Sequence, residues 1–146
     1  KENIFVVGCP SIDALEQEKD EDYKKIKQKF KIDILQDYIL IIQHPVTSEI
    51  NNVHKQFVET IEALKKIKKQ KLFVFPNNDA GSHKIINLIK KYNFNYCQTL
   101  SLREYKTLLK NSKALVGNSS SGIHEAATYK IPVINIGTRQ EGRTKL

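Results

Sequence analysis

Residues 113–136 read KALVGNSSSGIHEAATYKIPVINI, and this stretch decides the fold class. An apolar run is followed by a turn of glycine, asparagine and serine, a short helix-like segment and a second apolar run. A small, hydroxyl-rich turn between a strand and a helix leaves the first N–H groups of the helix free. These donors and the helix dipole attract an anion, usually phosphate. The glycines would let the backbone approach that ligand closely.

Glu125 would fall about one turn into this helix, where its carboxylate can accept hydrogen bonds from sugar hydroxyls. The stretch has a second interpretation, in which the Ser/Gly turn only caps a helix. The segment alone favours neither interpretation, so the rest of the chain must decide.

Strand-like and helix-like segments alternate along the whole chain. Continuous apolar runs predict buried strands, and apolar residues three or four apart predict helices. Ser101 and Glu104 form a capping box at the start of one helix. Such alternation is typical of a parallel sheet with helices on both faces, so we predict an α/β, doubly wound, Rossmann-like domain over residues 1–146. We expect strands at 3–7, 38–43, 71–75, 93–97, 113–116 and 132–136, and helices at 21–34, 51–69, 83–92, 101–110 and from the serine turn to about 129, with a short helix or loop at 13–20.

Distinctive polar residues come directly after the predicted strands. In doubly wound sheets, ligands bind outside the carboxyl ends of the strands. Five such loops at one edge of the sheet favour a nucleotide-binding site more strongly than any one loop does. The loops are marked by residues 8–11 and by His44, Asn77, Ser119 and Arg139.

The composition is that of one globular domain, long enough to bury a substantial core. The formal net charge of +8 comes mostly from lysines on the polar faces of predicted helices. Few aromatic residues are interleaved with them, so we predict no nucleic-acid partner. No apolar run approaches the roughly 20 residues that span a membrane. Cys9 and Cys97 form no disulfide framework and the four histidines are scattered, so we expect a cytoplasmic protein without a metal site.

Five motifs occur in order along the chain: residues 8–11 (GCPS), 43–47 (QHPVT), 75–82 (FPNNDAGS), 117–122 (GNSSSG, with Glu125) and 132–143 (PVINIGTRQEGR). In these motifs, and over nearly its whole length, the chain resembles the carboxyl-terminal half of hydrolysing UDP-N-acetylglucosamine 2-epimerases. Non-hydrolysing relatives differ, with an arginine-rich motif after the histidine strand and a Ser-Gly-Gly loop. The family's fold has two facing Rossmann-like domains (GT-B). The resemblance therefore implies that residues 1–146 are the second domain, and that the family's N-terminal domain and final helices are absent.

The resemblance implies a reaction in two steps. UDP leaves by elimination across the C1–C2 bond of the sugar nucleotide, and water then adds to the glycal to give an N-acetylmannosamine-type sugar. Removal of the weakly acidic C2 proton needs a carboxylate base, which the family places in its first domain. The departing diphosphate needs donors and cations, which this half contains. The inferred reaction needs no redox cofactor, and we expect none.

The resemblance also implies roles for individual residues of this chain. The histidine would be catalytic, donating to the β-phosphate or assisting proton transfer. The two serines would hold the diphosphate, the glutamate the ribose hydroxyls and the arginine the phosphates or sugar. The asparagine would orient the sugar or phosphate. The predicted residues are His44 as the catalytic group, and Asn77, Ser119, Ser120, Glu125 and Arg139 as UDP-sugar-binding groups.

Two other functions remain open from the sequence. A GT-B glycosyltransferase would also bind a nucleotide sugar on this half. A non-catalytic nucleotide-binding or basic interaction module would bind polyanions in a salt-dependent way. The sugar is open as well, with N-acetylglucosamine or a 2,4-diacetamido-6-deoxy sugar as candidates for sialic- or legionaminic-acid-type biosynthesis. The resemblance further implies that the full-length protein is a homo-oligomer.

Overall fold

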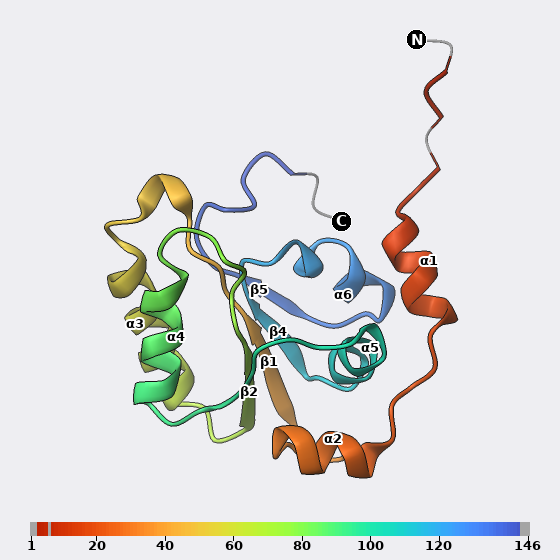
Figure 1. Ribbon diagram of the computed structural model, residues 1–146, viewed down its shortest axis with the longest axis horizontal. Helices are drawn as coiled ribbons and strands as arrows, with labels where there is room; N and C mark the ends of the chain where they lie inside the picture. Colours follow the sequence, from red (N-terminus) through yellow and green to blue (C-terminus); the bar gives the residue numbers. More distant parts are fainter. Residues whose placement is uncertain (1–2, 6, 144–146) are drawn as a thin grey trace.

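The computed structural model describes residues 3–5 and 7–143, and its centre is a parallel β-sheet (Figure 1). The strands are β1 (Tyr38–Ile42), β2 (Gln70–Val74), β3 (Asn95–Cys97), β4 (Ala114–Gly117) and β5 (Val133–Asn135). They lie in the order β3-β2-β1-β4-β5, and each neighbouring pair is parallel. All five residues of β1 are buried, as expected for the central strand of a sheet covered on both faces.

Helices connect the strands and cover both faces of the sheet. They are α1 (Pro10–Gln17), α2 (Tyr23–Phe30), α3 (Val53–Lys65), α4 (Ser82–Lys91), α5 (Leu102–Lys110) and α6 (Glu125–Thr128), with 3₁₀ turns η1 (Thr47–Glu49) and η2 (Ser120–Gly122). Within the described part of the chain, no helix is long and apolar enough to cross a membrane.

Alternate residues of the central strand point into two separate cores. Ile39 and Ile41 pack in a cluster with apolar residues of α3 and α4. Leu40 and Ile42 pack in the other cluster, with α2, α5 and α6. Figure 1 shows α3 and α4 on one side of the sheet and α5 and α6 on the other. This alternation confirms the predicted doubly wound α/β fold, because strand side chains have a period of two.

The chain changes direction in the sheet between β1 and β4. From β1 it proceeds outward through β2 to β3, and it then returns across the sheet to place β4 and β5 on the other side of β1. The connections that leave the carboxyl ends of β1 and β4 therefore turn toward opposite faces. Such a topological switch point opens a crevice at the edge of the sheet, where doubly wound domains bind their ligands.

Three predictions near the amino terminus are wrong. Residues 3–7 were expected to be a buried strand, but the described ones form no strand, and Ile4, Phe5 and Val7 are exposed by 75–79%; residue 6 lies outside the described residues. Figure 1 shows why, since this segment runs away from the sheet and has no strand beside it. Residues 8–11 accordingly follow no strand, and Pro10 begins α1. The helix predicted at 21–34 ends at Phe30, because Lys31 adopts a left-handed conformation that caps it.

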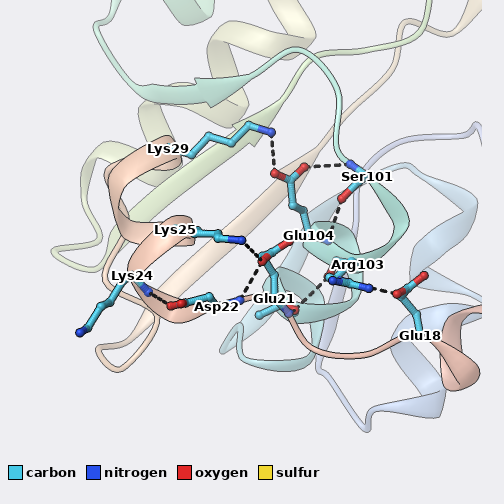
Figure 2. Close-up of polar contacts among 10 residues, drawn as sticks. Glu18, Glu21, Asp22, Lys24, Lys25, Lys29, Ser101, Arg103 and Glu104 are labelled. Carbon is cyan, nitrogen blue, oxygen red and sulfur yellow. Dashed lines mark hydrogen bonds and ion pairs between the residues drawn. The ribbon is translucent and has the colours of Figure 1, made fainter.

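Polar contacts attach the segment between α1 and α2 to the outer surface of α5 (Figure 2). The guanidinium of Arg103 donates to Glu18 over 3.1 Å, and the backbone N–H of Glu21 donates to the Thr107 hydroxyl over 2.7 Å. These contacts fix the path of the chain before the sheet begins. They hold it on the helix whose first residues border the ligand edge described below.

Glu104 joins α2 to α5 and also caps α5. Its carboxylate accepts from the Ser101 N–H over 2.9 Å, its own N–H donates to the Ser101 hydroxyl, and Lys29 forms an ion pair with it. The capping box is thus as predicted. We expect Glu104→Ala to lower the free energy of unfolding by about 1–2 kcal/mol, since it removes half of the box and the ion pair. Urea denaturation followed by circular dichroism measures this loss.

Glu62→Ala is the matched control, because Glu62 forms an exposed i,i+3 ion pair with Lys65 on α3. Its removal should change stability by less than about 0.5 kcal/mol. Equal losses in the two variants would contradict a special role for Glu104.

Candidate functional site

A cleft of about 450 Å³ opens at the switch point, along the carboxyl ends of β1, β2 and β4. Five of the six site residues predicted from the sequence line it. They come from the loops after four different strands, which the parallel sheet brings to one edge. The five residues are His44, Asn77, Ser119, Ser120 and Arg139.

Asn118 links the loops that leave β1 and β4. Its side-chain Oδ1 accepts from the His44 N–H over 2.7 Å, and its Nδ2 donates to the His44 carbonyl over 2.9 Å. Its own carbonyl accepts from Arg139 Nη1 over 3.1 Å and from Gln140 Nε2 over 2.7 Å. Since Asn118 is only 2% exposed, these bonds are shielded from water, and one residue holds both His44 and Arg139 in place.

The imidazole of His44 is held in one tautomer. Its Nδ1 accepts a 3.2 Å hydrogen bond from the Asn77 N–H, so a neutral ring carries its proton on Nε2. Burial lowers the pKa of His44 below its ordinary value, and the Arg139 charge lowers it further, while Asp79 opposes them. His44 is therefore neutral at pH 7, and Nε2–H is its remaining donor. Such a group can donate to a phosphate oxygen without adding a charge of its own.

The serine turn is built differently from the predicted strand–helix junction. Residues 120–122 form η2 rather than the start of a helix, and α6 begins only at Glu125 and is four residues long. The Ser119 hydroxyl accepts from the Ser121 N–H over 3.3 Å and lies 3.1 Å from the Ser121 hydroxyl. A helix this short has little macrodipole, so an anion here would depend on local hydroxyl and N–H donors and on Arg139.

Glu125 is the one predicted site residue that does not line the cleft. Its Oε2 atom is buried and has no hydrogen-bond partner among the described residues. The same is true of the hydroxyl of Tyr105, which does line the cleft. Burial raises the pKa of Tyr105, the side chain of Ser121 beside its hydroxyl lowers it, and the Glu125 charge adds to the rise. Ser121 lies near the Tyr105 hydroxyl without meeting the geometry of a hydrogen bond. The buried Oε2 atom of Glu125 and the Tyr105 hydroxyl on the cleft wall are therefore places where ligand hydroxyls could be satisfied.

Comparison with known proteins decides the family. The family model for UDP-N-acetylglucosamine 2-epimerase matches residues 1–146. The chain belongs to this family. A Legionella pneumophila UDP-N,N'-diacetylbacillosamine 2-epimerase (hydrolyzing) is 34% identical over 99% of the chain and 40% of the relative. A Neisseria meningitidis UDP-N-acetylglucosamine 2-epimerase is 30% identical over 98% of the chain and 38% of the relative. The chain thus spans about 40% of the length of the curated relatives it matches.

Solved structures confirm the fold. S. aureus MnaA, solved with UDP, superposes with a TM-score of 0.67 at 19% identity, over 97% of this chain and 39% of that one. The UDP-GlcNAc 2-epimerase from Methanocaldococcus jannaschii superposes with a TM-score of 0.60 at 19% identity, over 88% of this chain and 37% of that one. At this identity the two superpositions show the fold alone, and this epimerase-family chain shares the α/β architecture of both structures.

The glycine that ends β4 is required by the sheet itself. Gly117 has φ +140°, and a Cβ atom on it would lie 2.0 Å from the carbonyl oxygen of Ile42. Only glycine allows this close approach to the backbone of β1. It lets the two strands of the switch point meet tightly enough for Asn118 to reach His44.

Two parts of the site in this epimerase-family chain were missed by the sequence analysis. The first is Asn118, whose role depends on β4 lying beside β1, which no local pattern shows. The second is the wall after β3, where Leu100, Leu102 and Tyr105 line the cleft. The sequence did contain a signal for this wall, because its loop follows a predicted strand as the other site loops do.

Within the described ranges, no three His, Cys, Asp or Glu side chains are grouped as metal ligands would be. The cleft is lined instead by hydroxyl, amide, imidazole and guanidinium groups. These are groups that bind oxyanions and sugar hydroxyls directly.

Proposed function

We propose that this chain is the UDP-binding half of a hydrolysing UDP-sugar 2-epimerase. The observation that carries the proposal is the convergence of His44, Asn77, Ser119, Ser120 and Arg139 on one cleft at the switch point of the sheet. In this half, the diphosphate lies against the serine turn and Arg139, and the nucleoside lies along the wall after β3. UDP in the structure of the family neighbour from S. aureus supports the choice of ligand.

Each group has a physical task in this arrangement. Arg139 offers a positive fork to the diphosphate, and because Asn118 anchors one of its nitrogens, little side-chain entropy is lost on binding. The neutral His44 donates from Nε2 to the β-phosphate, which becomes the leaving group. Leu100 and Leu102 provide an apolar surface for the flat base. Glu125 and Tyr105 meet the hydroxyls of the ribose, which would supply the partners their buried atoms lack.

The reaction follows from these tasks. A carboxylate takes the C2 proton as the bond from C1 to the diphosphate oxygen breaks, and UDP leaves with the electron pair of that bond. His44, Arg139 and the serine hydroxyls stabilise the charge that develops on the β-phosphate. Water then adds across the C1–C2 double bond of the glycal. We assign the proton-transferring carboxylates to a preceding domain, consistent with relatives about two and a half times as long as this chain.

The substrate we propose is a UDP-linked 2-acetamido sugar. Relatives named for UDP-N,N'-diacetylbacillosamine and for UDP-N-acetylglucosamine both match nearly the whole chain, and a further relative is named Polysialic acid biosynthesis protein P7. Both sugars carry the acetamido group at C2, where the reaction occurs. We therefore place the enzyme at the start of sialic- or legionaminic-acid-type sugar synthesis. Release of UDP by the full-length protein without any acceptor distinguishes this activity from that of a glycosyltransferase.

Titration of UDP into the chain tests the binding site. We expect UDP to bind weakly and ADP more weakly still, with NMR chemical-shift changes at the serine turn. The Ser119→Ala/Ser120→Ala double variant should lower UDP affinity by about 10- to 100-fold, because hydrogen bonds to a charged phosphate are lost. Ser48→Ala is the control, since Ser48 lies outside this cleft. Equal binding of UDP and ADP, unchanged in the double variant, would refute the assignment of the site.

The same proposal predicts that the chain alone does not turn over substrate. It contains the groups that stabilise the leaving diphosphate but not those assigned to move protons. Measurable epimerisation of UDP-N-acetylglucosamine by the purified chain would contradict the assignment of the proton-transferring groups to another domain.

A further inference from the structure

A second cavity, of about 560 Å³, shares Arg139 with the UDP cleft. We call it the side cavity. Its walls are the loop after β1, the turn before α4 and the loop after β5, from which Pro45, Val46, Asp79 and Glu141 contribute. Arg139 lines both the side cavity and the cleft, so the two spaces meet at this guanidinium. A ligand that has its diphosphate at Arg139 can therefore extend into both.

The charges of the side cavity determine which end of such a ligand enters it. Its lining includes three carboxylates, Glu49, Asp79 and Glu141, and Arg139 is the one cation among the described residues that form it. A phosphate placed deep in this cavity would face like charges, whereas at Arg139 it meets the cation. The group inside the cavity is then neutral. Carboxylates bind neutral groups chiefly by accepting hydrogen bonds from hydroxyls or N–H groups.

The side cavity is held in shape before any ligand binds. The Thr138 hydroxyl donates to one oxygen of Glu49, and the Gln56 amide donates to the other. These two hydrogen bonds tie the loop after β5 to the loop and helix after β1. Both oxygens of Glu49 already accept hydrogen bonds, whereas the carboxylates of Asp79 and Glu141 accept none from the residues that the structure describes. Asp79 is half-buried and close enough to influence His44 electrostatically, so it lies near the reacting end of the ligand.

We propose that the side cavity binds the pyranose ring of the nucleotide sugar, with Asp79 accepting hydrogen bonds from ring hydroxyls or the acetamido N–H. Pro45 and Val46 offer apolar contact to the acetamido methyl. The volume is within the range of about 300–1,000 Å³ that is usual for small-molecule sites. This inference rests on the proposed function, which sets the diphosphate at Arg139. It adds the sugar-binding subsite and names a residue outside the predicted set.

The variant Asp79→Ala distinguishes a hydrogen bond between Asp79 and the sugar from a general effect of its negative charge. Removal of a hydrogen-bond acceptor from the sugar should lower the affinity of the chain for UDP-N-acetylglucosamine by about tenfold. Removal of a negative charge near Arg139 should leave UDP affinity unchanged or slightly raise it. Only the affinity for the sugar nucleotide is thus expected to fall. Glu141→Ala, at an exposed position in the loop after β5, is a second variant that leaves the turn before α4 intact, and it should show the same selectivity with a smaller effect.

NMR titration of the two ligands supplies the measurement, with Glu62→Ala as a control for charge. Amides of residues 46–49 and 79 should shift with UDP-N-acetylglucosamine and stay in place with UDP, whereas amides beside Arg139 should shift with both ligands. Two results would overturn the sugar subsite without contradicting the UDP cleft. One is identical shifts with both ligands, and the other is a parallel change of both affinities in Asp79→Ala and Glu141→Ala. If the folded, unaltered chain does not bind UDP at all, both the proposed function and this inference are overturned.

Discussion

Replacing Gly117 with alanine is expected to remove about 4 kcal/mol or more from the free energy of unfolding, a large share of the total for a domain of this size. A Cβ atom at this position would lie 2.0 Å from the Ile42 carbonyl oxygen and 2.5 Å from its carbon. Both are backbone atoms of the central strand, so no side chain can rotate away. The φ of +140° also places the residue where L side chains are strained. The strands β1 and β4 would have to separate.

Gly137→Ala is the control for the backbone conformation alone. Gly137 also has a positive φ, +72°, but no atom lies within 4 Å of the position its Cβ would take. We expect a loss of about 1 kcal/mol there. Urea denaturation of both variants measures the difference, which isolates the cost of forcing the two strands apart. Similar losses in both would mean that the contact between β4 and β1 is easily relaxed.

Most of the fold could be predicted because its signals are local. The run at Tyr38–Ile42 is apolar throughout, and the structure buries all five residues. The box of Ser101 and Glu104 starts α5 as expected. The segment at 3–7 is apolar after Asn3, yet it forms no strand in its described residues, because a strand needs a neighbour as well as a pattern. No strand of the described sheet lies beside it, so the prediction failed on a tertiary requirement.

Site residues whose position follows from the strand order could be predicted. Those whose role depends on contacts between loops were missed. His44, Asn77 and Arg139 follow separate strands, and a parallel sheet brings all such loops to one edge. Asn118 holds two of them together through its side chain and carbonyl, but that role appears only when β4 is placed beside β1. Asp79 lies in one of the five predicted loops, but its place beside Arg139 in one cavity depends on contact between loops that are 60 residues apart in the sequence.

Arg139→Ala should have the largest effect on ligand binding, lowering the affinity for UDP by about 30- to 100-fold. Its guanidinium faces the cleft and the side cavity together, so its loss removes the cation at the point where the diphosphate must lie. A second effect has a defined sign. The charge of Arg139 lowers the pKa of His44, so that pKa should rise in the variant, while burial keeps it below the ordinary value.

Arg103→Ala controls for the loss of one positive charge, because Arg103 pairs with Glu18 on the outer face of α5. It should change neither the affinity for UDP nor the titration of His44. NMR titration of the His44 ring against pH measures the second quantity independently of ligand. If Arg139→Ala weakened UDP binding without moving the His44 pKa, the arginine would act on the diphosphate alone. If the UDP affinity and the His44 pKa change together, His44 stays neutral at physiological pH partly because the diphosphate-binding cation lies beside it. Arg139 then determines both the binding of the diphosphate and the protonation state of His44.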